Sequence, residues 1–215
     1  MTAHLMSVRT WIAPLVGFLA VGGTLLSSCA GSSSLPVAQS SREAPLNVLN
    51  GAALEPAVDL PALTFTHSDG APFSTADTGD RLSLFFFGYT HCADVCPLTL
   101  AEFSQMRSEL GPDARRVDMY FVTLDPARDT ADRMRTYMAH FPGVVGLIGT
   151  DAELAAAQSA FGVISQRQDL GNGDYALDHT AATYLVNGDT QIQLVYPYGT
   201  SPDEIASDLQ RLLQS

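Results

Sequence analysis

The sequence lacks lysine altogether, because each of its 11 basic residues is an arginine, and this excludes chemistry through a lysine Schiff base. Basic charge is also scarce: 23 acidic residues give the 215-residue chain a formal charge of −12 at pH 7. Nucleic acids need a basic face for their phosphates, so we expect no nucleic-acid partner. An acidic surface would instead attract cations or a basic patch on another protein.

Cysteine is equally scarce, and the three that occur are Cys29, Cys92 and Cys96. Cys29 follows a segment with one arginine, no acidic residue and an apolar run over residues 11–26. This layout is typical of a secretory signal peptide over residues 1–28. The letters "LSSC" resemble a bacterial lipobox, which implies cleavage before Cys29 and lipid attachment to its sulfur. An uncleaved membrane anchor is the alternative, although about 16 apolar residues fall short of the roughly 20 that a spanning helix needs.

The chain therefore divides into three predicted parts. Residues 1–28 form the lipoprotein signal peptide, and either interpretation of this segment places the rest of the chain on the extracytoplasmic side of a bacterial membrane. Residues 29–58 are rich in Ser, Ala, Pro and Gly, and we expect a flexible tether there. Residues 59–215 are expected to form one folded domain, because their number is ample for a buried core.

Strand and helix signals alternate along this domain. We expect a hairpin over residues 63–74 that turns at Asp69-Gly70, and a buried central strand over 81–89. Further strands are expected at 117–125, 144–150, 161–168, 182–187 and 188–199, and helices at 98–110, 130–141, 151–160 and 201–213. This order indicates an α/β domain with a central mixed sheet flanked by helices. Because the core ends in an antiparallel hairpin and a helix, we predict a thioredoxin-like fold by analogy.

The stretch "FFFGYTHCADVCPLTL" contains Cys92 and Cys96, the two cysteines that remain after the leader is removed. Pro97 suits the first position of a helix, which predicts Cys96 at the N-cap, where the helix end favours a thiolate. The spacing lets the two Cα atoms approach within about 7 Å, as a disulfide requires, and also lets the loop open to hold an ion. A purely structural disulfide is disfavoured, because so short a loop constrains the unfolded chain little.

Four histidines could supply a third group to this pair: His67, His91, His140 and His179. His91 adjoins Cys92, but neighbouring side chains of an extended segment point in opposite directions. His67 and His140 are expected on the surface. His179 precedes an apolar strand, and in a thioredoxin-like sheet the loop before that strand packs against the cysteine turn. A capping or solvent-exposed His179 is the alternative that the residues leave open.

Two thiolates and one imidazole form a soft set of three ligands, which suits copper. Structural zinc usually takes four nitrogen or sulfur ligands, so a zinc site of that kind would need Asp94 as well. A catalytic zinc ion ranks lower than copper. An open site of three ligands, able to accept and release its ion, favours copper handling.

Three segments, "FFFGYTHCADVCPLTL", "LDPARDT" and "DHTAATYLVN", resemble the Sco/SenC family in sequence and in order. The resemblance covers residues 60–213 and implies a thioredoxin-like fold. It implies copper ligands at Cys92, Cys96 and His179. It also implies delivery of copper to the binuclear copper centre of cytochrome c oxidase, or reduction of that centre's cysteines. The implied partners are the oxidase subunit that carries this centre and another periplasmic copper carrier.

The sequence departs from the family pattern at Ala93, where the family usually has proline. Proline would stiffen the loop, so alanine bears on the redox potential and copper affinity rather than on the ligand set. Asp94 matches the family's acidic residue between the cysteines, and we expect it to influence partner docking or sulfur protonation, or else to cap a turn. Asp125, Arg128 and Asp129 match the family's second segment and are expected to be mainly structural.

Three functions would use a cysteine pair of this kind in different ways. A copper chaperone would hold copper with Cys92, Cys96 and His179 and pass it on by ligand exchange. A general extracytoplasmic thiol–disulfide oxidoreductase would attack a partner disulfide with Cys92 and resolve it with Cys96, or in the reverse order. A thiol peroxidase would need an arginine and a threonine beside one acidic thiol, and no such group is evident. The first two roles are compatible, and only copper binding needs His179.

Overall fold

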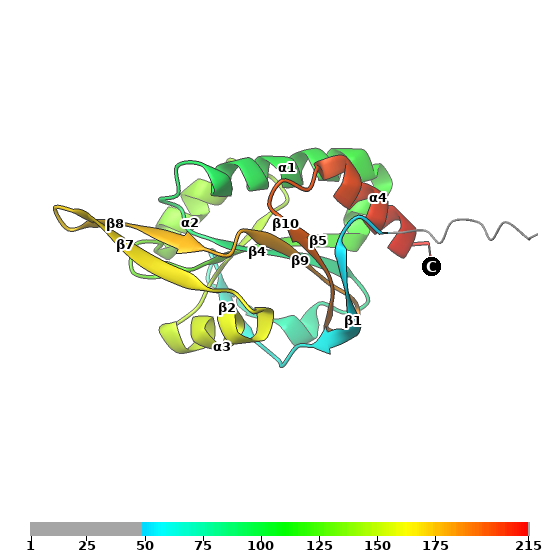
Figure 1. Cartoon of the computed structure of the whole chain (residues 1–215), viewed down its shortest axis with the longest axis horizontal. Coiled ribbons are helices and arrows are strands. Elements are labelled where there is room, and N and C mark those ends of the chain that lie inside the picture. The colour runs from blue at the N-terminus through cyan, green and yellow to red at the C-terminus, as the bar shows by residue number, and fades with distance from the viewer. Residues whose placement is uncertain (1–48, 215) are drawn as a thin grey trace, which may run out of the picture. The chain divides into compact units, whose positions relative to one another are not determined.

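The computed structural model describes residues 49–214, which form a layered α/β domain (Figure 1). The predicted signal peptide, Cys29 and the first part of the predicted tether lie outside these residues. Within residues 49–214, none of the helices combines the length and the apolar character of a membrane span.

An eight-stranded mixed sheet lies at the centre of the domain, in the order β1-β10-β9-β4-β5-β6-β2-β3. Its strands are β1 (Ala52–Asp59), β2 (Thr64–His67), β3 (Pro72–Ser74), β4 (Leu82–Gly88), β5 (Val117–Thr123), β6 (Val145–Ile148), β9 (Ala182–Val186) and β10 (Gln191–Pro197). The strands β4, β5 and β6 run parallel, whereas β9 pairs antiparallel with both β4 and β10. The predicted N-terminal hairpin is present as β2 and β3, and it pairs with β6 at one edge.

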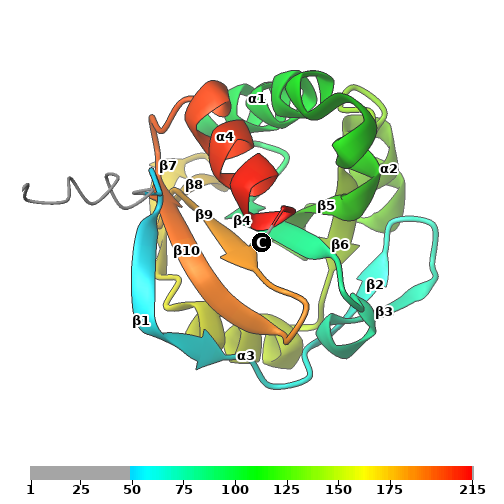
Figure 2. The ribbon, with the colours of Figure 1, turned by 90° about the vertical axis from the view of Figure 1, so that its right-hand side faces the viewer.

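Helices cover both faces of the sheet (Figure 2). The helices are α1 (Val95–Leu110), α2 (Ala131–Met138), α3 (Asp151–Phe161) and α4 (Pro202–Leu212), with short 3₁₀ turns at Thr75–Asp77 and Gly111–Arg116. Buried residues of α1, α2 and α4 share one hydrophobic core, and α3 packs in a second core across the sheet. This arrangement confirms the predicted thioredoxin-like fold, a mixed sheet between helical layers.

The central strand β4 explains why the sheet needs both layers. All seven of its residues are buried. Side chains of a strand alternate between the two faces, so Leu84 and Phe86 enter the core under α1, while Phe85 and Phe87 enter the core over α3. The near-continuous apolar run of the sequence therefore predicted a strand covered on both faces, and this prediction is confirmed.

Helix starts were also predictable from local chemistry. Thr150 is the N-cap of α3 and Ser201 is the N-cap of α4. Each hydroxyl accepts a hydrogen bond from the backbone N–H three residues later. The carboxylates of Glu153 and Glu204 in turn accept a hydrogen bond from the backbone N–H of the capping residue. This completes a capping box at each helix.

The folded domain begins earlier than the sequence indicated. β1 pairs antiparallel with the edge of β10, so the predicted tether is wrong for residues 52–58. The backbone N–H groups of Asn50 and Gly51 donate to the buried Asp208 carboxylate at 2.8 and 2.9 Å, which fixes the start of the strand. The pattern is weak because β1 is an edge strand with mostly exposed side chains and an internal proline, as edge strands tolerate.

A second difference concerns the segment that precedes β9. The strand expected at 161–168 occurs as β7 (Ser165–Gly171), but it pairs with β8 (Asp174–His179) in a separate two-stranded sheet. We call these two strands the β7–β8 arm, and Figure 1 shows it extending from the central sheet. The turn between its strands is built on Gly171, Asn172 and Gly173, which all have positive φ. "GNGD" is a typical hairpin turn, and this signal could have revealed β8.

Candidate functional site

The two cysteines lie where β4 ends and α1 begins, at the C-terminal edge of the parallel strands. Open α/β sheets place their ligands at such an edge. Gly88 closes β4, and a Cβ atom at this position would lie 2.6 Å from the Cys96 sulfur. Only glycine therefore leaves room for Cys96 to pack against the end of the central strand.

Cys96 differs from its prediction. The helix begins at Val95 with Asp94 as its N-cap, so Cys96 lies within the first turn, fully buried. Proline is tolerated throughout the first turn because those N–H groups have no helical partner, and Pro97 therefore does not mark the first residue. The hydrogen bond to the Cys92 side chain, together with burial, raises the pKa of Cys96 above its ordinary value. The prediction of a favoured thiolate at Cys96 is wrong.

The stabilised thiolate belongs to Cys92, which is half-buried in the loop before α1. The hydrogen bond from the Cys96 side chain lowers the pKa of Cys92 to about 5, against the opposing effect of burial. Backbone hydrogen bonds from Cys96 and Asp94 lower that pKa further, and so does the nearby His179. The amide groups at the helix end therefore act on the sulfur that lies outside the helix.

His179 is the last residue of β8 and reaches the cysteines from the arm. Its Nε2 atom lies 3.8 Å from the Cys96 sulfur. Its Nδ1 atom lies 3.1 Å from the carbonyl oxygen of Thr180, which can only accept a hydrogen bond. In the neutral form of the ring the proton is therefore on Nδ1, and the Nε2 lone pair faces the sulfur. The rings of Phe86 and Tyr89 contact the imidazole edge to face and fix its plane.

An open cavity of about 310 Å³ gives access to this site. Cys92 and Asp94 line it from the loop, and Leu177, Asp178 and His179 line it from the arm. The imidazole thus lies 3.8 Å from the Cys96 sulfur and lines the same cavity as Cys92. Asp94 faces the same cavity. Its backbone N–H forms a hydrogen bond with the Cys92 sulfur, whereas its side chain makes no capping hydrogen bond to the helix.

The other histidines stay away from the sulfurs. His67 is half-buried and lies edge-on to the Phe73 ring, and His140 is exposed after α2. His91 is exposed, and its Nδ1 atom lies 3.5 Å from the buried Asp129 carboxylate. The expectation that none of these three reaches the cysteine pair agrees with these positions.

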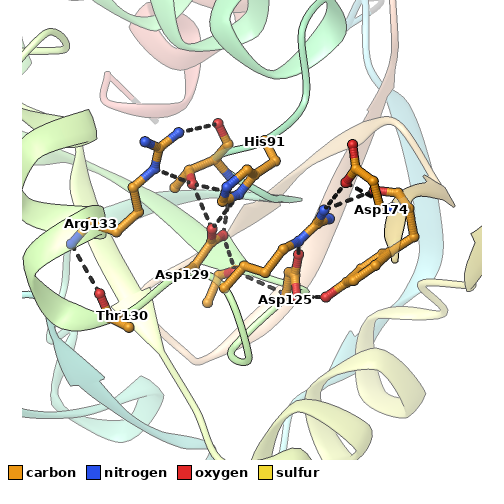
Figure 3. Close-up of polar contacts among 10 residues, drawn as sticks. His91, Asp125, Asp129, Thr130, Arg133 and Asp174 are labelled. Carbon is orange, nitrogen blue, oxygen red and sulfur yellow. Dashed lines mark hydrogen bonds and ion pairs between the residues drawn. The ribbon is translucent and has the colours of Figure 1, made fainter. Parts of the chain in front are cut away.

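A buried polar network ties the cysteine loop to the end of β5 and to the residues at the start of α2 (Figure 3). The Asp129 carboxylate accepts hydrogen bonds from the Thr90 N–H at 2.9 Å, the Thr90 hydroxyl at 2.6 Å and the Thr123 hydroxyl at 2.6 Å. Arg133 donates to the Thr90 hydroxyl at 3.0 Å. The Thr90 position, two residues before Cys92, is thereby fixed to the end of β5 and to α2.

His91, Asp125 and Asp129 bring three ligand atoms within 4.8 Å of one another, close enough to suggest a cation site. The carboxylates are already engaged, however: Asp129 by the donors named above, and Asp125 by Arg128 and Tyr175. These contacts support the predicted structural role of Asp125, Arg128 and Asp129. Sequence reasoning missed Tyr175, whose role follows from a contact with Asp125 across 50 residues.

Alkylation of the reduced chain by iodoacetamide should distinguish the two thiols. Because only the thiolate reacts, we expect the rate at Cys92 to rise with a midpoint near pH 5 and to be level above about pH 6. An ordinary thiol, with a pKa of about 8.5, would still be gaining rate at pH 8. Cys96 should stay unmodified while the chain is folded, and mass spectrometry at each pH measures both sites.

The control for this experiment is Cys96→Ala, which removes the largest cause of the lowered pKa. Its Cys92 midpoint should move toward higher pH. A Cys92 midpoint between pH 8 and 9 in the unaltered chain would contradict the assignment of the thiolate.

The SCO1/SenC family model matches residues 55–214, which make up most of the described domain. The chain belongs to the SCO1/SenC family. The match confirms the resemblance inferred from the three sequence segments. It also begins within β1, in agreement with the earlier start of the domain.

Solved structures of this family superpose on the chain. ScoI of Bradyrhizobium japonicum, whose structure has copper bound, is 35% identical, with a TM-score of 0.67 over 72% of this chain and 99% of that chain. The apo Sco1 protein of Thermus thermophilus is 32% identical, with a TM-score of 0.69 over 79% of this chain and 99% of that chain. Both likenesses support the thioredoxin-like architecture described above.

The human mitochondrial SCO1 homologue is 33% identical over 154 residues, which cover 65% of this chain and 51% of the human protein. The chain therefore spans about half the length of this mitochondrial relative.

Proposed function

We propose that this SCO1/SenC protein carries a copper ion bound by the sulfurs of Cys92 and Cys96 and the Nε2 atom of His179. The observation that carries this proposal is the approach of the His179 Nε2 lone pair to the Cys96 sulfur, 3.8 Å away, beside the Cys92 thiolate. Soft thiolates joined by an imidazole suit copper. The copper bound in Bradyrhizobium japonicum ScoI, a relative at 35% identity, supports the same cargo here.

The protonation states of the three groups fit this cargo. Cys92 is already inclined to the thiolate, and the hydrogen-bond geometry of His179 leaves Nε2 as the nitrogen that can bind a metal ion. Cys96 holds its proton in the metal-free state and must release it when an ion binds, so uptake is coupled to proton release. The site opens into the cavity on the side of Cys92 and His179, which leaves room for an acceptor's ligands during exchange.

The recipient in this proposal is the subunit of cytochrome c oxidase that carries the binuclear copper centre, as the family resemblance implies. Another periplasmic copper carrier would load the site. The formal charge of −12 suits docking to a basic patch on either partner. A lipid at Cys29 would keep the domain beside its membrane partner, on the extracytoplasmic side of a bacterial membrane.

A second activity is favoured by the unequal thiols. The accessible Cys92 thiolate attacks one sulfur of a partner disulfide and forms a mixed disulfide, releasing the partner's other sulfur as a thiolate. The Cys96 thiol then loses its proton and attacks the Cys92 sulfur, which releases the second partner thiolate. The partner gains two electrons, and Cys92 and Cys96 end as a disulfide. The pKa order supports Cys92 as the attacking thiol, the first of the two predicted orders.

Anaerobic titration of the fully reduced full chain with Cu(I), against a chromogenic chelator, tests the chaperone role. We expect one tightly bound ion per chain, and loss of tight binding in Cys92→Ser, in Cys96→Ser and in the oxidised chain. A reduced chain that takes up neither Cu(I) nor Cu(II) would refute copper transport. Reduction of an oxidised copper-centre domain by the metal-free dithiol would then support the exchange activity alone.

A further inference from the structure

We propose that Asp125, Arg128 and Tyr175 form a latch that holds the β7–β8 arm in the position where His179 faces Cys96. The three are positioning residues for the metal ligand, and none of them contacts the cysteine sulfurs. The proposal deepens the proposed function and rests on it for its copper measurement. The arm is largely exposed, whereas the Asp125 and Arg128 side chains at its base are buried or mostly buried.

Besides these three residues, the arm is tied to the domain by a hydrogen bond from Gln158 to the Ser165 hydroxyl at 2.7 Å and by Leu177, which packs against the core. Its two strands pair only with each other and form a sheet separate from the central one. Six of the seven residues of β7 are exposed. An isolated two-stranded hairpin is marginally stable at best, so the orientation of the arm depends on the few side chains that tie it to the domain. The position of His179 depends on these contacts together with those of its ring to Phe86 and Tyr89.

Arg128 makes most of these ties. Its guanidinium donates to the Asp125 carboxylate at 2.5 Å, to the Tyr175 carbonyl at 2.9 Å and to the Asp174 carboxylate at 3.2 Å. Asp125 is almost fully buried and Arg128 mostly so, which makes their contact much less screened than the exposed pairs of the surface. Figure 3 shows Asp125 and Asp174 on either side of these shared contacts.

Tyr175 closes the latch. Its hydroxyl donates to the second oxygen of Asp125 at 2.6 Å, and its ring centroid lies 3.5 Å from the Arg128 guanidinium carbon. Arg167 of β7 lies 3.6 Å from the centroid of the same ring. Asp125, Arg128 and Tyr175 thus contact each other in every pairing, and the ring also engages the second strand of the arm. Such a closed set of charge-assisted bonds resists the rotation of any one member.

The latch acts on the face of β8 that matters for the metal site. Alternate residues of a strand share a face, so Tyr175, Leu177 and His179 point to the same side. Leu177 packs against the core and forms a backbone hydrogen bond with the Tyr89 hydroxyl. The Tyr89 ring contacts His179 and lies 5.8 Å from the Arg128 guanidinium carbon. A shift at Tyr175 would therefore be transmitted along one face to the imidazole.

The test compares Arg128→Gln with Arg135→Gln in the reduced full chain. Arg135 is a matched control, because it also pairs with an aspartate three residues earlier, Asp132 at 2.7 Å, but on the exposed surface of α2. We expect Arg128→Gln to weaken Cu(I) affinity by about 10- to 100-fold, as loss of a residue that orients a metal ligand does, and Arg135→Gln to leave it unchanged. Competition with a chromogenic chelator measures both.

A double-mutant cycle separates positioning from general damage. If Arg128 acts through His179, then Arg128→Gln should cause no further loss of affinity in a His179→Ala chain. An equal loss in both backgrounds, or full affinity in Arg128→Gln, would overturn the latch. Should Arg128→Gln fail to fold, Tyr175→Phe removes only the hydroxyl bond to Asp125 and should still weaken affinity a few-fold.

A metal-free measurement keeps the latch distinct from the copper proposal. In the reduced chain, nuclear Overhauser contacts between the His179 ring and the rings of Tyr89 and Phe86 should be strong in wild type and Arg135→Gln. They should weaken in Arg128→Gln. If wild type bound no copper, the proposed function would fail, and these contacts alone would decide the latch: unchanged contacts refute it, and weakened contacts support it.

Discussion

Replacement of His179 by alanine is expected to weaken Cu(I) binding by more than about 100-fold, because it removes the only nitrogen ligand of the proposed site. Loss of a residue that merely orients a ligand already costs about 10- to 100-fold, and loss of the ligand itself should exceed this. Two sulfurs would remain, so a weaker two-coordinate ion can persist. Anaerobic competition with a chromogenic chelator, on the reduced full chain, measures the change.

The same substitution should spare the thiol chemistry. The pKa of Cys92 is lowered mainly by the Cys96 side chain, then by backbone amides, and His179 is the smallest of these contributors. We therefore expect the alkylation midpoint of Cys92 to move only slightly in His179→Ala. One substitution can thus distinguish the copper-chaperone activity from the reductase activity, since only copper binding depends on the imidazole.

His140→Ala is a suitable control, since it deletes an imidazole that is exposed after α2 and contacts neither cysteine. Its Cu(I) affinity should equal that of wild type. Equal affinities in wild type and His179→Ala would remove His179 from the ligand set and would leave a two-sulfur site.

The sequence predicted the parts of the fold that rest on strong local patterns. The apolar run of β4 required two covering layers, and the helices expected at 151–160 and 201–213 agree with α3 and α4, because these signals depend on neighbouring residues alone. The grouping of Cys92, Cys96 and His179 followed from topology, since the strand after His179 lies next to β4 in the sheet.

The features that the sequence did not reveal depend on distant contacts. β1 is held by β10 and by Asp208, more than 130 residues away, and its own residues resemble a linker. The arm gains its place from Arg128 and Tyr175, whose contact spans 47 residues. The sulfur protonation was misjudged because the helix begins two residues earlier than expected and buries Cys96 in its first turn, where the Cys92 side chain and burial raise its pKa. Local sequence patterns indicate helix and strand propensity, whereas these features depend on contacts between residues that are distant in the sequence.

Asp129 is the residue whose loss should most damage the loop that carries the cysteines. Its side chain is fully buried and accepts three hydrogen bonds from Thr90 and Thr123. The two hydroxyls could turn to other acceptors, but the Thr90 N–H is held by the backbone and cannot. Asp129→Ala therefore leaves at least one buried donor unsatisfied and a cavity beside it.

We expect Asp129→Ala to lower the free energy of unfolding by about 1 to 3 kcal/mol, the cost of leaving a buried hydrogen-bond donor unsatisfied. Urea unfolding of the reduced full chain measures this loss. Asp132→Ala, three residues away and 87% exposed at its side chain, should change stability by less than about 0.5 kcal/mol. Equal stability of Asp129→Ala and wild type would mean that the loop relaxes onto water without cost. In that case the hydrogen bonds of Asp129 would contribute nothing to the stability of the fold.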